Sequence, residues 1–349
     1  MPSESPQSAQ PPSADSLIEY YYAQGVTDGM PVVPPSRESV AAMLAGGGLG
    51  ASDTVAFFAP QNKRISAEKV AINAVMAGCL PEYMPVVVAS LQAFCEPAFN
   101  GIGPATTTGS TAMTLVLNGP LAVRLGVNAR DNALGHGFRA NATIGRALRL
   151  LIMNVLEISP GRNDRSTLGN PARYSFCFAE NEVDSPWDPL HVERGFQPEQ
   201  STVSLFATIG QTTIRIADDK DPEPSLLLVA DGMSFLGSHN IMGQGEFLVV
   251  FAGELCGRCQ AKGMGKAEVK RFLYDHARRK VADLKRTRRI KEPLTAEDES
   301  TWRHVTARPE DIVIVAAGSA VGYHAACLPG WGLENPIRSV TMPITVPGV

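Results

Sequence analysis

Two similar stretches decide the fold class of this chain: TLVLNGPLAVRLG at residues 114–126 and FLVVFAGELCGRC at residues 247–259. Each has the pattern of a short apolar strand that enters a helix through a glycine. The stretches TVAFFAP at residues 54–60 and TVSLFAT at residues 202–208 form a second pair whose members resemble each other. We interpret the two pairs as a duplication. The sequence therefore predicts an α/β or α+β fold in which two similar strand–helix–strand halves pack as layered sheets and helices.

The positions of these stretches give the expected domain organisation. Residues 1–15, MPSESPQSAQPPSAD, are rich in proline and serine and lack hydrophobic spacing, so we expect a disordered tail. Residues 16–198 would form the first half and residues 199–349 the second, with one continuous domain as the alternative. The boundary falls near residues 195–201, and pockets often form at such interfaces.

Composition and charge describe a globular protein and argue against several classes of function. Of 349 residues, 44% are apolar and 19% are charged, which allows a large core. The net charge of -4 gives no general attraction to nucleic acid, and the basic run at residues 278–291 reads as a solvated helix or a partner surface. No apolar run reaches the roughly 18 residues of a membrane span, and no signal peptide is recognisable. We expect a cytoplasmic protein without a membrane or nucleic-acid partner.

The stretch YSFCFAENEVDSPWDPLHVERG, residues 174–195, places many ionisable groups directly after an apolar strand. If the strand continues through FCFAENE, Glu180 and Glu182 point to the same face and Asn181 to the other. Two neighbouring carboxylates raise one another's pKa, which suits a general acid or base, or they offer oxygens to a divalent cation. The alternative is a solvated strand end. No other cofactor is evident.

The loop that completes this stretch adds a histidine, an arginine and a tryptophan. His191 is a candidate acid or base, and Arg194 is a candidate receptor for a carboxylate or phosphate. Trp187 lies between two prolines and would form a rigid apolar wall of the site. The alternative is an ordinary surface loop that is held in place by one buried tryptophan.

A second candidate site lies in GHGFRANATIGRALRL, residues 135–150. Asn141 or Thr143 is expected to cap a helix whose free N–H groups attract anions. Three basic side chains lie nearby: His136, Arg139 and Arg146. Backbone amides and guanidinium groups together can bind a carboxylate or phosphate. The glycine spacing matches neither a phosphate loop nor a dinucleotide fingerprint, and plain helix capping is the alternative.

A third candidate is VAAGSAVGYHAA at residues 315–326. A glycine-rich turn from a strand into a helix, at Gly318 and Ser319, would expose backbone amides to an anion. The alternative is that Gly318 only lets the strand turn and that His324 is a hydrogen-bonded core histidine.

The cysteines raise the question of thiol chemistry. Cys256 and Cys259 are expected at a helix N-terminus, where the helix lowers a thiol pKa and a dithiol redox pair is possible. Cys79 follows a helix and would act as a nucleophile only with a basic partner close by. The alternative is packing, since the six cysteines lie mostly in apolar segments.

Five strings give the chain a resemblance to a family of largely uncharacterised bacterial proteins: DGMPVVPPS (28–36), INAVMAGCLPEYMPVV (72–87), RANATIGRALRL (139–150), YSFCFAENEVDSPWDPLHVERG (174–195) and KAEVKRFL (266–273). Members of that family are often encoded beside a small protein with a Cys- or selenocysteine-Gly-Ser-Cys motif. The resemblance implies a two-component enzyme in which the partner supplies a thiol or selenol and this chain supplies a pocket. AGELCGRC departs from the strand-Gly-Pro-helix pattern of the family, which argues against a dithiol role for Cys256 and Cys259.

Taken together, these features predict an enzyme, or the larger subunit of one, that acts on a small anionic substrate of the carboxylate type. The reaction class would be lyase, hydratase or hydrolase, with Glu180 or Glu182 transferring a proton and His191 as the second acid or base. Arg139 and Arg146 would hold the anion. The alternatives are a non-catalytic scaffold for a thiol or selenol partner and a thiol oxidoreductase. We expect a homo- or hetero-oligomer.

Overall fold

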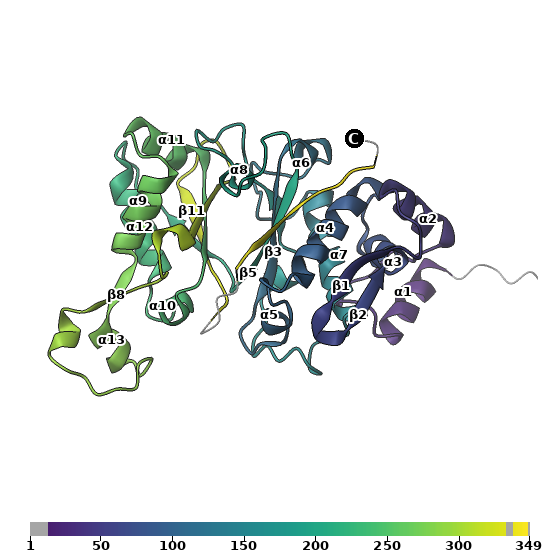
Figure 1. Ribbon diagram of the computed structural model, residues 1–349, viewed down its shortest axis with the longest axis horizontal. Helices are drawn as coiled ribbons and strands as arrows, with labels where there is room; N and C mark the ends of the chain where they lie inside the picture. The colour runs from purple at the N-terminus through teal and green to yellow at the C-terminus, as the bar shows by residue number, and fades with distance from the viewer. Residues whose placement is uncertain (1–12, 333–337, 348–349) are drawn as a thin grey trace, which may run out of the picture.

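The computed structural model describes residues 13–332 and 338–347, which fold into four layers (Figure 1). Two four-stranded sheets face one another in the middle, and helices cover the outer face of each sheet. The expected class, a layered α/β or α+β fold, is confirmed. Within the described part of the chain, no helix is both long and apolar enough to cross a membrane.

The first sheet has the strand order β12–β5–β3–β4. Its strands are β3 (Ala112–Asn118), β4 (Cys177–Ala179), β5 (Thr202–Thr208) and β12 (Val340–Pro343). Strands β3 and β4 are parallel, whereas β5 is antiparallel to both β3 and β12. Its outer face is covered by α3 (Ala67–Ala77), α4 (Met84–Cys95) and α7 (Arg139–Asn154).

The second sheet has the strand order β10–β7–β11–β6. Its strands are β6 (Thr212–Arg215), β7 (Phe247–Phe251), β10 (Ile312–Ala316) and β11 (His324–Pro329). Strands β7 and β10 are parallel, and β11 is antiparallel to both β7 and β6. The covering helices are α9 (Pro222–Met233), α11 (Gly253–Ala261) and α12 (Lys266–His276).

The two sheets repeat one topology. Strand β3 leads through Gly119 into α6 (Pro120–Arg124), as β7 leads into α11 at Gly253, so the duplication expected for these two stretches is present. The first half then adds the parallel strand β4 and the antiparallel strand β5. The second half likewise adds the parallel strand β10 and the antiparallel strand β11. The last strand of each half joins the sheet of the other half. Strand β6 of the first half pairs with β11 in the second sheet, and β12 of the second half pairs with β5 in the first sheet.

The second expected pair of repeats is wrong. Strand β1 (Thr54–Phe58) forms a separate hairpin with β2 (Lys63–Ser66), whereas β5 lies inside the first sheet. All seven residues of β5 are buried, but only one of the five in β1 is. Apolar strands of this length look alike in sequence because the pattern reports a pleated surface and not a place in the sheet. Since β5 pairs with β3, the chain leaves the first sheet after Thr208 and not near residues 195–201.

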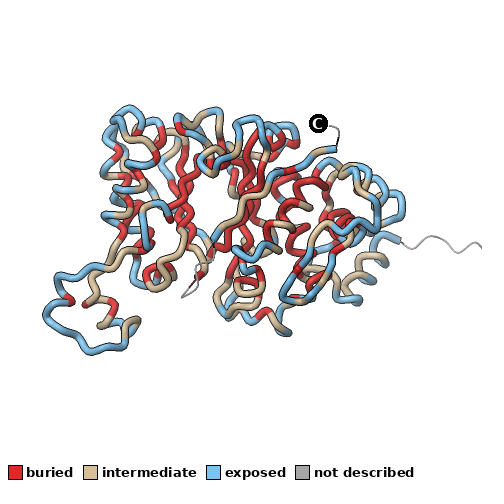
Figure 2. The backbone as a smooth tube through the Cα atoms, viewed as in Figure 1, coloured by how far each residue is buried: buried red, intermediate tan, exposed pale blue. Residues whose placement is uncertain are grey.

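All residues of the central strands β3 and β7 are buried, which explains why most of them are apolar (Figure 2). In β3, Met113, Leu115 and Leu117 face the helices, and Val116 faces the other sheet. Each large apolar side chain buried in this way contributes about 1.5–3 kcal/mol to folding. The inner face of β3 also carries Asn118, and this polar residue at the end of the strand begins the site described below.

The other elements include two N-terminal helices and several short helices and turns. Helix α1 (Ala14–Ala23) begins before the expected end of the tail at residue 15, and residues 1–12 of that tail lie outside the described residues. Helix α2 (Arg37–Gly46) is capped by Ser36. The shorter elements are α5 (Ile102–Thr106), α8 (Leu190–Glu193), α10 (Asn240–Gly243) and the 3-10 turns Ala59–Gln61, Pro81–Tyr83, Pro171–Arg173, Glu297–Glu299 and Pro309–Asp311.

The basic run forms part of a lobe that projects from the second half (Figure 1). The lobe contains β8 (Arg278–Lys280), α13 (Val281–Arg286) and β9 (Trp302–His304). The Arg278 guanidinium lies 4.7 Å from the centre of the Trp302 ring, and Lys285 Nζ lies 2.8 Å from Asp298 Oδ2. The single solvated helix expected for this run is therefore a strand followed by a short helix.

Candidate functional site

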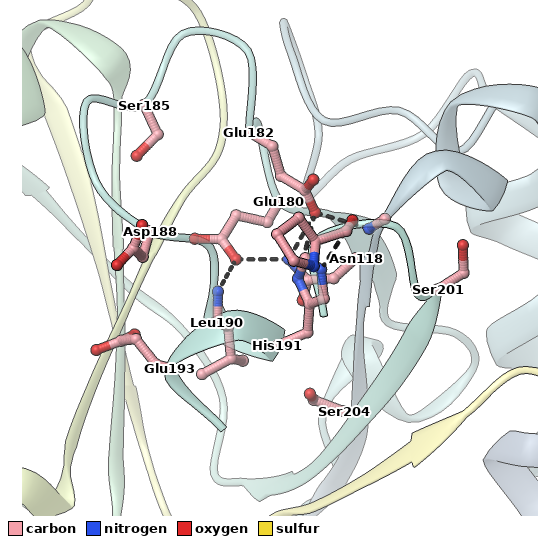
Figure 3. A network of polar contacts seen from close by, with 12 residues as sticks. Asn118, Glu180, Glu182, Ser185, Asp188, Leu190, His191, Glu193, Ser201 and Ser204 are labelled. Carbon is pink, nitrogen blue, oxygen red and sulfur yellow. Dashed lines mark hydrogen bonds and ion pairs between the residues drawn. The ribbon is translucent and has the colours of Figure 1, made fainter. Parts of the chain in front are cut away.

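The carboxyl ends of β3 and β4 meet at one edge of the first sheet, where a polar network forms (Figure 3). Ligands of α/β sheets commonly bind at the carboxyl ends of parallel strands. Asn118 ends β3, and its Nδ2 donates to Glu180 Oε2 at 2.7 Å and to Glu182 Oε1 at 2.9 Å. The backbone N–H of Gly119 donates to the same Glu182 oxygen at 2.7 Å. One short segment after β3 thus holds both carboxylates.

The two glutamates converge for a different reason from the one expected. Strand β4 ends at Ala179, and the N–H of Glu182 donates to the carbonyl of Glu180 at 3.0 Å, so the backbone turns here. The expectation of one strand with both carboxylates on the same face is wrong. The turn and the shared donor on Asn118 bring them together instead.

Glu180 is fully buried, and its carboxylate is held from two sides. Oε2 accepts the N–H of Leu190 at 2.7 Å in addition to Asn118, and Oε1 lies 3.6 Å from Lys266 Nζ. Burial raises the pKa of Glu180 above its ordinary value, and the charge of Lys266 and the two N–H donors offset this only in part. A carboxyl group with a raised pKa can act as an acid or base near neutral pH.

Lys266 is a residue of this network that the sequence did not reveal as such. It is the first residue of α12 in the second half, and its Nζ donates to the Asp188 carbonyl at 2.7 Å and to Glu193 Oε2 at 2.8 Å. Burial opposes ionisation of Glu193, but Lys266 and Lys270 outweigh it and hold the pKa of Glu193 below its ordinary value. Lys266 and Lys270 are four residues apart, so the sequence indicates that they share one face of the helix. It does not indicate which residues they bind.

Helix α8 brings His191 back to this edge, whereas Arg194, which follows the helix, binds at β12 on the other side of the sheet. His191 is fully buried, and its Nδ1 lies 3.9 Å from Glu182 Oε1. Arg194 donates to the hydroxyls of Ser339 and Thr341 at 2.6 Å each. Burial lowers the pKa of Arg194, and the charges of Glu246, Glu193 and Glu180 oppose this.

Several buried polar atoms at this edge have no hydrogen-bond partner in residues 13–332 and 338–347: Asn118 Oδ1, Glu180 Oε1, His191 Nδ1 and Thr202 Oγ1. Asn118 and Thr202 are paired across β3 and β5. Buried polar atoms without partners are rare in proteins and often mark a functional site or a place for water or an ion. Their concentration at the end of β3 distinguishes this edge from the rest of the sheet.

Asn181 and Trp187 have structural positions. The N–H of Asn181 donates to the Ala316 carbonyl at 2.7 Å, which joins the end of β4 to the end of β10. Trp187 packs in the core between the second sheet and its helices, with its ring centre 6.5 Å from that of Phe251. It is therefore not the wall of a pocket beside the glutamates.

The arginines expected to hold an anion are occupied elsewhere. Arg139 Nε donates to the Gly78 carbonyl at 3.0 Å. Arg146 binds both oxygens of Asp28 at 2.8 Å, and its Nη2 also donates to the Pro31 carbonyl at 2.8 Å. Neither guanidinium joins the network around the two glutamates.

The expected helix cap is also absent. Helix α7 begins at Arg139, and no side chain accepts a hydrogen bond from its first turn. Asn141 lies inside the helix, where its Oδ1 accepts the N–H of Asn128 at 2.8 Å and fixes the preceding loop. Thr143 Oγ1 donates back to the Arg139 carbonyl at 2.8 Å. The helix starts earlier than expected because this loop, and not a cap, positions its first turn.

The remaining candidates line two adjoining hollows between the loops at the sheet ends. Gly318 and Ser319 line a hollow of about 550 Å³, and His136 and Asn141 line one of about 670 Å³. The hollows share Leu134, Gly135 and Gln211. Glu180, Glu182 and His191 line neither of them. The two hollows therefore contain only some of the expected binding residues, and these lie apart from the glutamates.

The turn at Gly318 does not lead into a helix, contrary to expectation. Residues 317–323 connect β10 to β11, and β7 lies between these two strands in the sheet. Gly318 has φ of 101°, and its N–H donates to the Ala129 carbonyl at 2.8 Å. Its positive φ serves this strand connection, and its amide is not free for an anion.

The cysteines do not form a reactive thiol site in this structure. Cys256 and Cys259 lie in the body of α11 and are buried, which raises both pKa values, that of Cys259 to about 12. Burial also raises the pKa of Cys79 to about 12, and its Sγ donates to the Thr143 carbonyl at 3.3 Å. The expected helix-terminal thiolate is absent because the helix begins three residues before Cys256 and turns that side chain into the core.

Within the ranges that the structure describes, no group of three or more His, Cys, Asp or Glu side chains is placed to hold a metal ion. Comparison with protein-family models and with curated proteins finds no match to this chain.

Proposed function

We propose that this chain is an enzyme, or the larger subunit of a two-component enzyme, that performs acid/base chemistry on a small substrate of the carboxylate type. The observation that carries this proposal is Glu180, a fully buried carboxyl group with a raised pKa beside several polar atoms that have no partner among the described residues. Carboxyl groups whose pKa values are strongly perturbed by burial and a charged partner are concentrated at functional sites. The reaction class would be that of a lyase, a hydratase or a hydrolase.

Glu182 is the residue that we assign to meet the substrate. Its side chain is 28% exposed, whereas that of Glu180 is fully buried. Asn118 and Gly119 fix one of its oxygens, and in the described chain no hydrogen bond is made by the other. A carboxylate held in this way is oriented to accept a proton from a substrate or from water.

The residues behind Glu182 would control where its proton goes. His191 Nδ1, 3.9 Å from Glu182 Oε1, is the second acid or base. Glu180 and Lys266 form the buried pair that sets the electrostatic environment. Arg130 is exposed and lies 3.3 Å from Asp184, which is on the same loop as Glu182, and would attract the substrate's negative charge.

The proposal can be tested by proton exchange, which reports turnover whatever the product is. The purified chain is incubated in D₂O with a panel of small hydroxy, unsaturated and keto acids, alone and with a candidate Cys- or selenocysteine-motif partner. NMR then follows deuterium incorporation and product formation. We expect turnover of at least one acid by the wild-type protein and none by E182Q, with E199Q as an exposed control that retains activity.

The exchange experiment also has clear contrary results. Turnover by E182Q at the wild-type rate would remove Glu182 from the mechanism. The absence of exchange and product across the panel, with and without the partner, would contradict acid/base catalysis on this substrate class. Circular dichroism of E182Q shows whether loss of activity comes from loss of the fold.

A non-catalytic scaffold for a thiol or selenol partner is the second candidate function. One observation favours it: burial raises the pKa of all six thiols of this chain, so reactive sulfur or selenium would have to come from a partner. Co-purification with such a partner, together with full activity of the complex formed with E182Q, would support the scaffold and contradict the enzyme.

A further inference from the structure

Arg149 is a buried arginine that forms no ion pair with any residue that the structure describes. It lies on α7 between Leu148 and Leu150, and only 7% of its surface is exposed. Its Nε donates to the Arg173 carbonyl at 2.8 Å. Within residues 13–332 and 338–347, its two terminal nitrogens make no hydrogen bond and it takes part in no ion pair. A charged side chain in this position is unusual, since buried arginines are nearly always paired.

The guanidinium lies against a hollow of about 790 Å³. Loops at residues 25–29 and 159–174 form most of its wall. Its polar lining includes Asp164, Ser166, Asn170, Arg173 and Tyr174, and its apolar lining includes Met153, Pro160, Leu168 and Pro171. This size and this mixture of apolar wall and few polar groups are typical of a small-molecule site.

The carboxylates near Arg149 are each taken by another arginine. Asp28 gives both of its oxygens to Arg146 at 2.8 Å, and Asp164 is ion-paired with Arg173. Three arginines and two carboxylates leave one positive charge uncompensated. Burial and the repulsion of Arg173 lower the pKa of Arg149 only to about 10, so the group is charged at neutral pH.

We propose that this hollow binds an organic monocarboxylate whose carboxylate group pairs with Arg149. The planar guanidinium can donate two parallel hydrogen bonds to a carboxylate. A single uncompensated charge matches a monoanion, whereas a phosphate dianion would meet the negative charges of Asp28 and Asp164 as well. The apolar residues opposite would contact the carbon body of the acid.

The Arg149 hollow is distinct from the glutamate network. Tyr174, before β4, lines the hollow, and Glu180 follows the other end of that strand. Glu180, Glu182 and His191 do not line the hollow. Binding at Arg149 therefore does not depend on the function proposed for Glu182.

Isothermal titration of the full-length protein with acetate, hexanoate, benzoate and inorganic phosphate tests the site. We expect hexanoate or benzoate to bind more tightly than acetate, and phosphate to bind weakest. R149M should lower the affinity at least about tenfold, because it removes a charge-assisted bidentate contact. R149K retains the charge without the planar pair of donors, so its affinity should be intermediate.

A control variant separates binding at Arg149 from binding elsewhere on the protein. R162M makes the same change at an exposed arginine near the hollow and should leave the affinity unchanged. The proposal is overturned if R149K and R149M both bind the acids as the wild type does, if phosphate binds more tightly than the acids, or if none of the four binds below about 10 mM. If R149M does not fold, R149K alone tests the proposal, which is overturned if R149K binds the acids as tightly as the wild type does.

Discussion

Asn118 Nδ2 lies 2.7 Å from Glu180 Oε2 and 2.9 Å from Glu182 Oε1, so a single amide nitrogen joins the buried carboxylate to the partly exposed one. An amide can do this because it carries two N–H donors and no charge. No other protein group that donates to both glutamates is present in the described part of the chain. This contact makes the network depend on the residue that ends β3.

The first prediction concerns that contact. N118D would replace the donor with a third carboxylate, so three acceptors would face one another in a buried place. We expect the free energy of unfolding in urea at pH 7 to fall by about 3 kcal/mol, as when a buried charge loses its partner. Q260E adds the same charge on an exposed part of α11 and should change stability little. Equal effects of the two changes would contradict the geometry of the network.

The second prediction is a pH dependence of stability. The pKa of Glu180 is raised in the folded protein above the ordinary value of 4.5, so the folded state holds this proton more tightly than the unfolded state. The stabilisation by this proton is complete below about pH 4.5 and is lost as pH rises through the folded pKa. The difference in unfolding free energy, E180Q minus wild type, should therefore increase from about pH 4 to pH 8 in urea titrations.

Glu193 is the matched control for that pH dependence, because its pKa is lowered in the fold. Its stabilising contribution is complete above the ordinary pKa and is lost as pH falls through the folded pKa. The difference for E193Q minus wild type should accordingly decrease as pH rises from below the ordinary pKa. If E180Q and E193Q show slopes of the same sign, the assigned direction for Glu180 is wrong.

The third prediction compares two glycines. Gly119 has φ of 85°, and a Cβ atom there would collide with the Gln200 carbonyl oxygen, so G119A should destabilise the fold by about 2 kcal/mol or more. Gly257 lies in α11 with nothing within 4 Å of an added Cβ atom, so G257A should stabilise it by about 0.5–1 kcal/mol. Thermal unfolding measures both, and a G119A protein as stable as the wild type would refute the close approach.

The fourth prediction concerns thiol reactivity. A buried thiol with a raised pKa is mostly protonated and reacts slowly. In the folded protein at pH 8, Cys256 and Cys259 should not react with a disulfide reagent, and the C256S/C259S variant should lose no fast-reacting thiol. In urea the wild type should show all six thiols. A mixed disulfide trapped at Cys256 under native conditions would restore the dithiol interpretation.

Local sequence signals predicted many elements but few partners. A helix cap such as Ser36 depends on residues only three positions apart, so it is a local feature. The glycine turn after β3 was predicted for the same local reason. The cap expected at Asn141 was wrong, because its side chain bonds a loop thirteen positions earlier and not the helix end. The expected strand through Glu182 was wrong because the backbone turns at Glu180.

The sequence by itself determined the layered fold class, the repeated strand and glycine pattern, and the presence of acid, base and guanidinium groups in residues 174–195. Periodicity and turn chemistry act over a few residues, so they can be read without the fold. Only the tertiary structure decided that β6 and β12 exchange sheets, that Lys266 faces Glu180, and that Arg149 forms no ion pair among the described residues. These outcomes depend on which distant elements share one buried place, because burial and pairing there set the pKa and the charge balance.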